Sequence, residues 1–463
     1  MKLHQTLLSL LLALLLLLSC GASASADAQI RPYSLQIWVG EQAAPVRAMQ
    51  NDFAGNLFLS LADLSAALEG TPRAFSISYQ YNQTDGEFFS LSTGRSAGNP
   101  SRAAGLESEP QLSSFLYARY RIFIDGQERR YYGYKLESDL FLGLADIQLL
   151  LDLPVQRRED GLHFDPEQRF RPDLPLLAEE GYFESFSAVL LADADTGAVL
   201  YARNASVPVP VASVSKLMTY LLLCEDVTDG KLSLQDTVTV SPSAALLSRG
   251  ADGMVKLQEG AQIPAWELTA AMLLASSNEC ALALAEHLSG SEEAFVDRMN
   301  RKAEELGLRG SRFYNPHGLP MYLSGPVPAK VQNLMSAEDL LVLSRAVLSA
   351  EPKITDFTSL SFGSMPSLNY KTFNSNVLVF NLDGCSGLKT GSTNKAGFCL
   401  VATLPVTVEE ETHTAVAVIL GAESPDVRNQ AAELLLRYAR DTWEEQGFPA
   451  PEGAAPVRPG KEA

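Results

Sequence analysis

One serine and one lysine, Ser213 and Lys216, have the spacing of a nucleophile and its base. Ser213 follows a proline-containing stretch and opens a largely apolar run over residues 214–223, so we predict a helix that begins at the serine. Residues three apart share one face of a helix, which places the amine beside the hydroxyl. An apolar helix would partly desolvate the amine, favour its neutral form and let it activate the hydroxyl without a histidine. The plainer alternative is a helix-capping serine next to a lysine that reaches solvent.

The Ser-x-x-Lys pattern is a weak signal on its own. It recurs at Ser386 with Lys389 and at Ser392 with Lys395. Context separates the three pairs, because only Ser213 follows prolines and opens an apolar helical run. The choice among them therefore depends on what else the chain contains.

Two further motifs occur downstream. Ser276 and Asn278 form Ser-x-Asn between two apolar helical runs, and Lys389-Thr390-Gly391 lies in a strand-like segment. Each motif alone is a modest signal. The ordered set of Ser-x-x-Lys, Ser-x-Asn and Lys-Thr-Gly, each in the local structure that it needs, is the signature of penicillin-binding proteins and serine β-lactamases.

Periodicity predicts the elements that must position these motifs. Helical runs lie at 214–224, 266–288, 336–349 and 427–441, and strand-like runs at 188–191, 199–202, 385–391, 397–403 and 414–421. Strands at both ends with helices between them predict a sheet built from the two ends of this region.

The region from about 185 to 441 resembles a low-molecular-mass penicillin-binding protein, a serine-type D-Ala-D-Ala carboxypeptidase of peptidase family S11. The segments that carry the resemblance are 193–197, 212–219, 313–319, 374–376 and 387–391. The resemblance implies an α/β (α+β) fold of the β-lactamase/transpeptidase-like type. In that fold an antiparallel sheet is flanked by helices and accompanied by a helical lobe.

The resemblance also implies roles for the catalytic residues. Ser213 would be the acylated nucleophile and Lys216 its general base. Ser276 would relay a proton to the leaving D-alanine amine, and Asn278 would hydrogen-bond the substrate amide. His317 lies in a family-like segment and is interpreted as a structural residue.

Substrate-binding residues follow from the same resemblance. Lys389 and Thr390 would engage the terminal carboxylate with help from Arg428, and Gly391 would let the substrate backbone lie against the strand. The backbone amide of Ser392, together with that of the nucleophile, would form the oxyanion hole. Position 392 often carries a larger residue in the family, which leaves the shape of the subsite open.

The function implied is a serine-type D-Ala-D-Ala carboxypeptidase that trims peptidoglycan stem pentapeptides in cell-wall biogenesis and remodelling, with no cofactor or metal. β-Lactam antibiotics would acylate it as inhibitors. A serine β-lactamase is one alternative, but the Glu-x-x-Leu-Asn segment typical of class A enzymes does not occur. A non-catalytic sensor of wall peptides or β-lactams is another, and an intact nucleophile set argues against it.

The N-terminal segment predicts export. Residues 1–26 read as a signal peptide with a leucine-rich core too short to span a membrane. Residues 17–21 resemble a lipobox, which would make Cys20 a lipidated membrane anchor. Small-x-small sites at 22–24 and 24–26 offer the alternative of ordinary cleavage, so the protein is expected outside the cytoplasm in either case.

Composition bears on partners and on redox state. Lys and Arg number 36 against 55 Asp and Glu, a net charge of −19, which disfavours nucleic acid as a partner. The remaining cysteines sit in apolar runs and are expected to be buried free thiols rather than disulfides: Cys224, Cys280, Cys385 and Cys399.

A weak duplication precedes the catalytic region. The octapeptide at 57–64 recurs at 140–147, and each copy follows a strand-like run that ends in a turn. Each copy therefore predicts strand, turn, strand and a short helix, similar to the stalk modules found at the N-terminus of copper amine oxidases, with no copper implied. The expected domains are a duplicated module at 27–164, a proline-rich linker at 165–184, the catalytic domain at 185–443 and a disordered tail at 444–463. We expect the module to position the enzyme without taking part in the chemistry.

Overall fold

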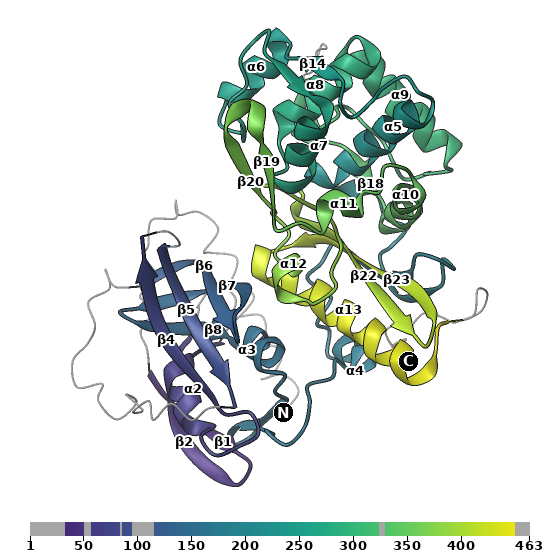
Figure 1. The fold of residues 1–463 in the computed structure, drawn as a ribbon. Coiled ribbons are helices and arrows are strands. Elements are labelled where there is room, and N and C mark those ends of the chain that lie inside the picture. The colour runs from purple at the N-terminus through teal and green to yellow at the C-terminus, as the bar shows by residue number, and fades with distance from the viewer. Residues whose placement is uncertain (1–32, 51–56, 84–85, 95–114, 324–328, 450–463) are drawn as a thin grey trace, which may run out of the picture.

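The computed structural model describes residues 33–50, 57–83, 86–94, 115–323 and 329–449. They form a smaller N-terminal module and a larger C-terminal part, which lie side by side in Figure 1. Within these ranges no helix is both long enough and apolar enough to cross a membrane. The lipobox around Cys20 lies outside the described residues.

The N-terminal module is one ten-stranded sheet in the order β4-β5-β6-β7-β8-β3-β2-β1-β10-β9. The first copy of the duplication is β1 (Tyr33–Val39), β2 (Gln42–Gln50), β3 (Leu57–Ser60) and α2 (Leu61–Ala67). The second copy is β6 (Phe115–Ile124), β7 (Gln127–Leu136), β8 (Asp139–Gly143) and α3 (Leu144–Leu151). Each copy thus has one more short strand before its helix than the sequence pattern predicted. The copies join through antiparallel pairing of β3 with β8. The remaining strands are β4 (Phe75–Asn82), β5 (Gly86–Thr93), β9 (Val155–Arg158) and β10 (Gly161–Phe164).

A buried arginine with two carboxylate partners joins the first copy to the second. Arg47 Nε lies 2.8 Å from Asp63 Oδ2, and Arg47 Nη2 lies 2.6 Å from Asp139 Oδ2. Asp63 belongs to α2 and Asp139 to β8, so one guanidinium links a helix of the first copy to a strand of the second. All three side chains are buried.

The second copy lacks this pair. Asp146 of α3 corresponds to Asp63, but the strand register puts Tyr132 in the place of Arg47. Burial raises the pKa of Asp146 well above its usual range, and Gln430 of the last helix, not an arginine, hydrogen-bonds it. The helix of the second copy therefore has no internal ion pair at this position and instead contacts the C-terminal part through Asp146 and Gln430.

The Arg47→Met variant should lose about 3–5 kcal/mol of unfolding free energy, because it leaves two buried carboxylates without their partner. The Asp146→Asn variant is the matched control. Since folding raises the pKa of Asp146, this carboxyl favours the folded state most below its unfolded pKa and costs stability as pH rises. At neutral pH the asparagine should therefore be neutral or stabilising. Urea unfolding at pH 5 and 7.5 measures both, and equal losses in the two variants would contradict this account.

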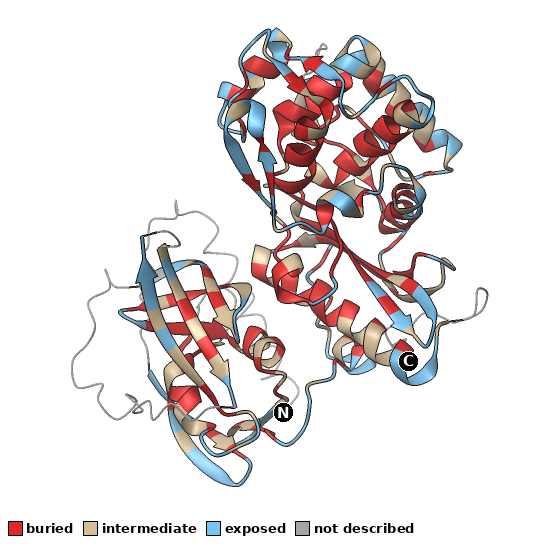
Figure 2. Cartoon of the chain, in the orientation of Figure 1, coloured by how far each residue is buried: buried red, intermediate tan, exposed pale blue. Residues whose placement is uncertain are grey.

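The C-terminal part is built on a five-stranded antiparallel sheet in the order β12-β11-β23-β22-β21. Its strands are β11 (Ala188–Asp193), β12 (Val199–Arg203), β21 (Gly387–Thr393), β22 (Gly397–Val408) and β23 (Glu411–Ala422). The prediction of a sheet made from both ends of the region is confirmed. Alternate residues of β11 enter different cores: Leu190 packs toward the helical lobe, and Leu191 packs toward α13 (Pro425–Gln446). Burial on both faces explains why residues 188–192 of β11 are apolar without alternation (Figure 2).

The helical lobe lies between β12 and β21 in the chain. Its helices are η3 (Ala212–Ser215), α5 (Lys216–Thr228), α6 (Pro242–Arg249), α7 (Ala265–Leu274), α8 (Asn278–Ser289), α9 (Glu292–Glu305), α10 (Ala337–Ser349), α11 (Thr355–Thr358) and η4 (Pro366–Leu368). The short helix α12 (Leu378–Asn381) follows in the chain but packs on the other face of the sheet, where its Leu378 enters the core beneath α13. Short two-stranded antiparallel sheets accompany them: β13 (Val209–Pro210) with β18 (Leu334–Met335), β14 (Thr237–Thr239) with β15 (Gln262–Pro264), β16 (Met321–Leu323) with β17 (Ala329–Val331), and the hairpin of β19 (Phe362–Met365) with β20 (Tyr370–Phe373). The four cysteines here and in the sheet are buried free thiols, as expected.

Polar contacts dock the N-terminal module onto the C-terminal part. The backbone N–H of Arg130 in β7 donates to Asn381 Oδ1 (2.7 Å), and Asn381 Nδ2 donates back to the Arg130 carbonyl (2.8 Å). Arg129 pairs with Asp383 (2.8 Å), and Tyr117 donates to Asp426 at the start of α13 (2.9 Å). The two parts are therefore in direct contact.

The segment expected to be a plain linker also packs against the C-terminal part. It contains α4 (Leu174–Glu179), whose Leu174 and Ala178 enter the core beneath α13. These two apolar side chains are four residues apart and so share one face of the helix, which explains why this segment folds onto the core.

Candidate active site

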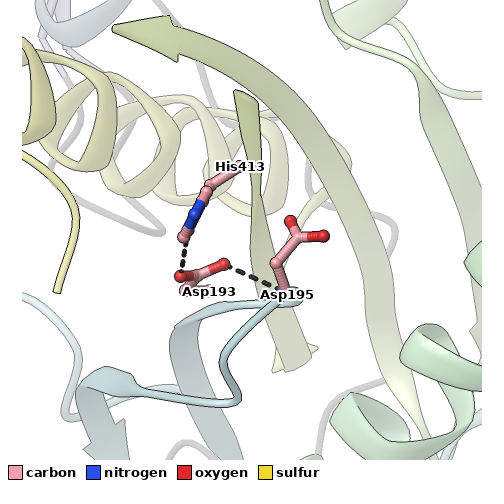
Figure 3. Close-up of side chains that lie close together, drawn as sticks. All are labelled: Asp193, Asp195 and His413. Atoms are coloured by element: carbon pink, nitrogen blue, oxygen red, sulfur yellow. Dashed lines mark hydrogen bonds and ion pairs between the residues drawn. The ribbon is translucent and has the colours of Figure 1, made fainter. Parts of the chain in front are cut away.

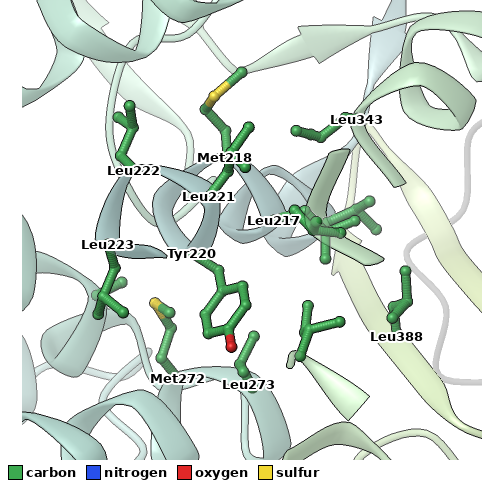
Figure 4. Close-up of a cluster of buried hydrophobic side chains, with 14 of the residues drawn as sticks. Leu217, Met218, Tyr220, Leu221, Leu222, Leu223, Met272, Leu273, Leu343 and Leu388 are labelled. Atoms are coloured by element: carbon green, nitrogen blue, oxygen red, sulfur yellow. The ribbon is translucent and has the colours of Figure 1, made fainter. Parts of the chain in front are cut away.

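Ser213 and Lys216 meet where η3 continues into α5. Lys216 Nζ lies 2.8 Å from Ser213 Oγ. Lys216 is fully buried because the following residues of α5 enter the core of the lobe, among them Leu217, Met218 and Tyr220 (Figure 4). Burial, reinforced by the nearby cation of Lys389, lowers the pKa of Lys216 well below its usual value. The amine is thus biased toward its neutral form.

The hydrogen-bond partners of Lys216 suit a neutral amine. Its Nζ lies 2.8 Å from Asn278 Oδ1 and 2.7 Å from the His317 carbonyl oxygen, in addition to Ser213 Oγ. A neutral amine has two N–H donors and one lone pair. In the neutral amine the amide and carbonyl oxygens would accept both donors, and rotation of the Ser213 hydroxyl, which also lies 3.3 Å from the His317 carbonyl oxygen, would turn its proton toward the lone pair. This arrangement supplies a base for the serine.

Unusual backbone conformations surround the pair. Ala212, directly before the nucleophile, has φ +49°, and Ser276 has φ +64°. Residues other than glycine rarely adopt positive φ, and such strain concentrates at functional sites at a cost of about 1–3 kcal/mol each. The Ala212 carbonyl is closely covered by Gly318, where an added Cβ would lie 2.1 Å from that oxygen. Glycine at 318 is therefore what allows the His317 carbonyl to approach Lys216.

Ser276 and Asn278 lie at the break between α7 and α8. Ser277 caps α8 by accepting a hydrogen bond from Cys280 N, so Asn278 is the first residue of the helix. Asn278 accepts from Lys216 and donates through Nδ2 to the Asp252 carbonyl (3.0 Å). The sequence interpretation assigned Asn278 to the substrate amide, and the structure adds a direct contact with the base.

The Lys-Thr-Gly strand, β21, runs beside the nucleophile. Lys389 is fully buried and donates to the Thr390 carbonyl (3.0 Å), and burial together with the cation of Arg428 lowers the pKa of Lys389 to about 7. Burial also lowers the pKa of Arg428 to about 10, and its guanidinium is held by Asn429 Oδ1 (2.8 Å). Thr390 Oγ1 lies 2.6 Å from Ser375 Oγ. Two mutually repelling buried cations and a hydroxyl make a receptor for an anion.

Gly391 has a role that the sequence did not reveal. A Cβ at this position would lie 2.8 Å from Ser213 N and 2.9 Å from the Val211 carbonyl oxygen. Both are backbone atoms that cannot yield as a flexible side chain would. The glycine therefore permits close packing of β21 on the nucleophile turn, whereas the sequence interpretation invoked contact with substrate.

The rival Ser-x-x-Lys pairs have different geometry. Ser386 Oγ is bonded to Thr403 Oγ1 (2.8 Å), and a strand carries residues three apart on opposite faces, which keeps Ser386 from Lys389. Ser392 and Lys395 are exposed. Neither pair offers a desolvated amine beside a serine hydroxyl.

Asp193, Asp195 and His413 bring three possible metal-ligand atoms within 4.8 Å of one another (Figure 3). The oxygens of this cluster already have partners. Asp193 accepts from the Asp195 N–H (2.9 Å), from Thr196 Oγ1 (2.7 Å) and from His413 Nδ1 (2.7 Å), and Asp195 Oδ2 accepts from Thr414 N (2.7 Å). These bonds account for the cluster as the support of the β11–β12 turn.

Two contributors escaped the sequence interpretation. His317 was expected to be structural; its buried ring has its pKa lowered to about 3 by burial and by Lys216, and its carbonyl is the group that contacts the amine. Asn333, fully buried, donates to Ser215 Oγ and to the Asn315 carbonyl (both 2.9 Å) and so fixes the segment beside the nucleophile. An isolated asparagine between two short strands gave no usable signal.

Comparison with known proteins agrees with this geometry. A profile of the D-alanyl-D-alanine carboxypeptidase family, peptidase family S11, matches residues 178–424. The chain is 34% identical over 264 residues to D-alanyl-D-alanine carboxypeptidase DacF of Bacillus subtilis, covering 56% of this chain and 63% of the relative. It is 30% identical over 264 residues to a D-alanyl-D-alanine endopeptidase of Escherichia coli, covering 56% and 77%. A solved peptidoglycan synthesis regulatory factor, PBP3 of Streptococcus pneumoniae, aligns with TM-score 0.50 and 28% identity over 55% of this chain and 71% of that one.

The sheet, the helical lobe and the Ser-Lys pair between them define a β-lactamase/transpeptidase-like α+β fold of the penicillin-binding type. Within that class, the chain belongs to the D-alanyl-D-alanine carboxypeptidase family, peptidase family S11. It spans 63% and 65% of the length of the first two curated relatives, DacF and a D-alanyl-D-alanine endopeptidase of Pseudomonas aeruginosa.

Proposed function

We propose that this protein is a serine-type D-Ala-D-Ala carboxypeptidase that removes the terminal D-alanine from peptidoglycan stem peptides and is acylated by β-lactams. The observation that carries the proposal is the buried Lys216 amine, 2.8 Å from Ser213 Oγ with its other contacts to oxygen acceptors. A protein that only binds wall peptides needs no such base.

The reaction proceeds through an ester on Ser213. Lys216 takes the hydroxyl proton as Oγ attacks the carbonyl of the penultimate D-alanine, and the backbone amides of Ser213 and Ser392 stabilise the oxyanion. Ser276 relays this proton from Lys216 to the departing amine, so the peptide C–N bond breaks, free D-alanine leaves and Lys216 is neutral again. Water, deprotonated by Lys216, then cleaves the ester and restores the serine.

The terminal carboxylate of the substrate is the anion that Lys389, Thr390 and Arg428 suit. A bound carboxylate would relieve the repulsion between the two cations that lowers the pKa of Lys389. Recognition of the chain end in this way makes the enzyme a carboxypeptidase.

The test is release of D-alanine from diacetyl-Lys-D-Ala-D-Ala and from the same peptide with a C-terminal amide. We expect steady release from the acid and at least about a tenfold lower kcat/KM for the amide, since each charge-assisted hydrogen bond contributes roughly 1.5–3 kcal/mol. Binding without release would indicate a sensor. Rapid, steady hydrolysis of penicillin would indicate a β-lactamase, and equal rates on acid and amide would reject the carboxylate-binding roles.

This function places the protein outside the cytoplasm, where peptidoglycan is exposed. We propose that Cys20 carries a lipid anchor and that the N-terminal module holds the catalytic domain away from the membrane. Mass spectrometry of the mature N-terminus tests the anchor: a chain that begins at Asp27 contradicts it.

A further inference from the structure

A large groove lies between the N-terminal module and the catalytic domain, beside the contacts that dock them. Its volume is about 1030 Å³. One wall comes from β6 and β7 of the module, and the other from the β19–β20 hairpin and the α12 region. Its lining combines charged side chains from both walls with the rings of Phe362, Phe373 and Phe380.

The groove is cationic in a protein whose net charge is −19. Five of its lining residues are Arg or Lys and two are carboxylates. Glu128 is shared between Arg121 (3.0 Å) and Arg130 (2.7 Å), and Asp383 pairs with Arg129 (2.8 Å). Cations thus outnumber the carboxylates that could neutralise them.

Two cations remain for a ligand. Arg119 projects from the module wall and Lys371 from the hairpin wall, and both are exposed. Among the residues that the structure describes, no carboxylate lies within ion-pair distance of either. They face a common space from opposite sides, so a structural role in docking the module does not account for them.

Aromatic side chains accompany these cations. Phe362 and Phe373 are 53% and 55% exposed, which is unusual for phenylalanine. Lys371 Nζ lies 5.7 Å from the centre of the Phe362 ring, and the Arg130 guanidinium lies 3.9 Å from that of Phe380. Exposed rings beside cations suit a peptide that carries carboxylates and apolar methylenes rather than a free small anion.

The groove is continuous in the chain with the proposed active site. The hairpin strand β20 ends at Phe373, and two residues later Ser375 Oγ bonds Thr390 Oγ1 (2.6 Å) of the substrate-binding strand. Two residues of extended chain span about 7 Å. One polymer could therefore occupy both places at once.

We propose that this groove binds an acidic peptide segment of the same wall polymer whose D-Ala-D-Ala end lies at Ser213. The inference rests on the proposed function and deepens it, because it gives the N-terminal module a part in selecting substrates. Arg119 and Lys371 are the residues that read the carboxylates, and Phe362 and Phe373 pack against the peptide.

Two synthetic peptides that end in Lys-D-Ala-D-Ala test the proposal, one extended at its N-terminus by four glutamates and the other by four glutamines. Fluorescence anisotropy on the full chain gives the Kd of each, and D-alanine release gives KM. We expect the wild type to prefer the glutamate peptide, with a preference that fades as salt is added. The Arg119→Gln/Lys371→Gln protein should lose about three- to tenfold in affinity for it. Its activity on diacetyl-Lys-D-Ala-D-Ala should not change.

Arg309→Gln/Lys353→Gln, which alters two exposed cations outside the groove, is the matched control and should keep the preference. Equal Kd values for the two peptides on the wild type, or an unchanged preference in the groove variant, would overturn the proposal. Binding of inorganic polyphosphate with no binding of the glutamate peptide would also overturn it. Glutamate preference without any D-alanine release would leave the groove standing and reject the proposed function instead.

Discussion

Ser213→Ala should abolish covalent labelling of the protein by a fluorescent penicillin and leave the fold intact. The acyl-enzyme requires a hydroxyl, and Ser213 Oγ is the hydroxyl that lies 2.8 Å from the buried Lys216 amine. Release of D-alanine should fall by on the order of 10⁶-fold, as happens when other activated serine nucleophiles are removed. Gel fluorescence and intact-protein mass spectrometry measure labelling, and circular dichroism checks the fold.

Ser386→Ala is the matched control, because Ser386 also begins a Ser-x-x-Lys pattern. Its hydroxyl bonds Thr403 inside the protein, so the variant should lose only about 1 kcal/mol of stability and keep full labelling. Labelling that persists in Ser213→Ala, or that vanishes in Ser386→Ala, would show that the nucleophile has been assigned to the wrong serine.

The catalytic pair could be predicted from the sequence because its geometry is local. Ser213 and Lys216 are three residues apart, and helical periodicity alone brings their side chains together. The apolar residues that follow them also predicted that the lysine would be buried, and this burial lowers its pKa. Recognition of Ser276, Asn278 and Lys389 depended instead on a known order of motifs, since nothing local links them to the pair.

Contacts made by backbone atoms across long stretches of chain could not be predicted. The His317 carbonyl reaches Lys216 over 101 residues, and every residue type has a carbonyl. The close packing of Gly391 on the nucleophile turn likewise depends on the meeting of two distant segments. Only the three-dimensional path of the chain supplies this information.

One feature of the N-terminal module could be predicted from the sequence and another could not. Its duplication could be detected because the repeated octapeptide forms the strand and helix that bury the core of each copy. Its docking on the catalytic domain could not be predicted, because Arg129, Arg130 and Asn381 are polar residues of a kind common on solvent-exposed surfaces.

Helix α9 of the catalytic domain could have been predicted but was not. Its buried Phe295, Met299 and Ala303 are spaced four apart, which is a helical pattern that the sequence interpretation did not use.

Replacement of Lys216 should distinguish a base from a mere positive charge. Lys216→Ala removes the amine and should slow acylation by about 10²–10⁴-fold, the usual contribution of a positioned general base. Lys216→Arg keeps a cation of similar length, but a guanidinium stays protonated and cannot accept the Ser213 proton. Both variants should therefore be impaired to a similar extent. A Lys216→Arg protein that is acylated at nearly the wild-type rate would mean that charge, and not proton transfer, is what Lys216 supplies.

The pH dependence of the wild type gives the same distinction without mutation. Acylation should rise with pH through the lowered pKa of Lys216, because its neutral form is the base. It should fall as pH passes about 7, where Lys389 loses the charge that attracts the carboxylate of the substrate or of penicillin. The profile of kcat/KM, which reports the free enzyme, should thus be bell-shaped. Lys389→Arg should move the falling limb to higher pH, because its guanidinium stays charged. A falling limb that stays in place in this variant would assign that limb to another group.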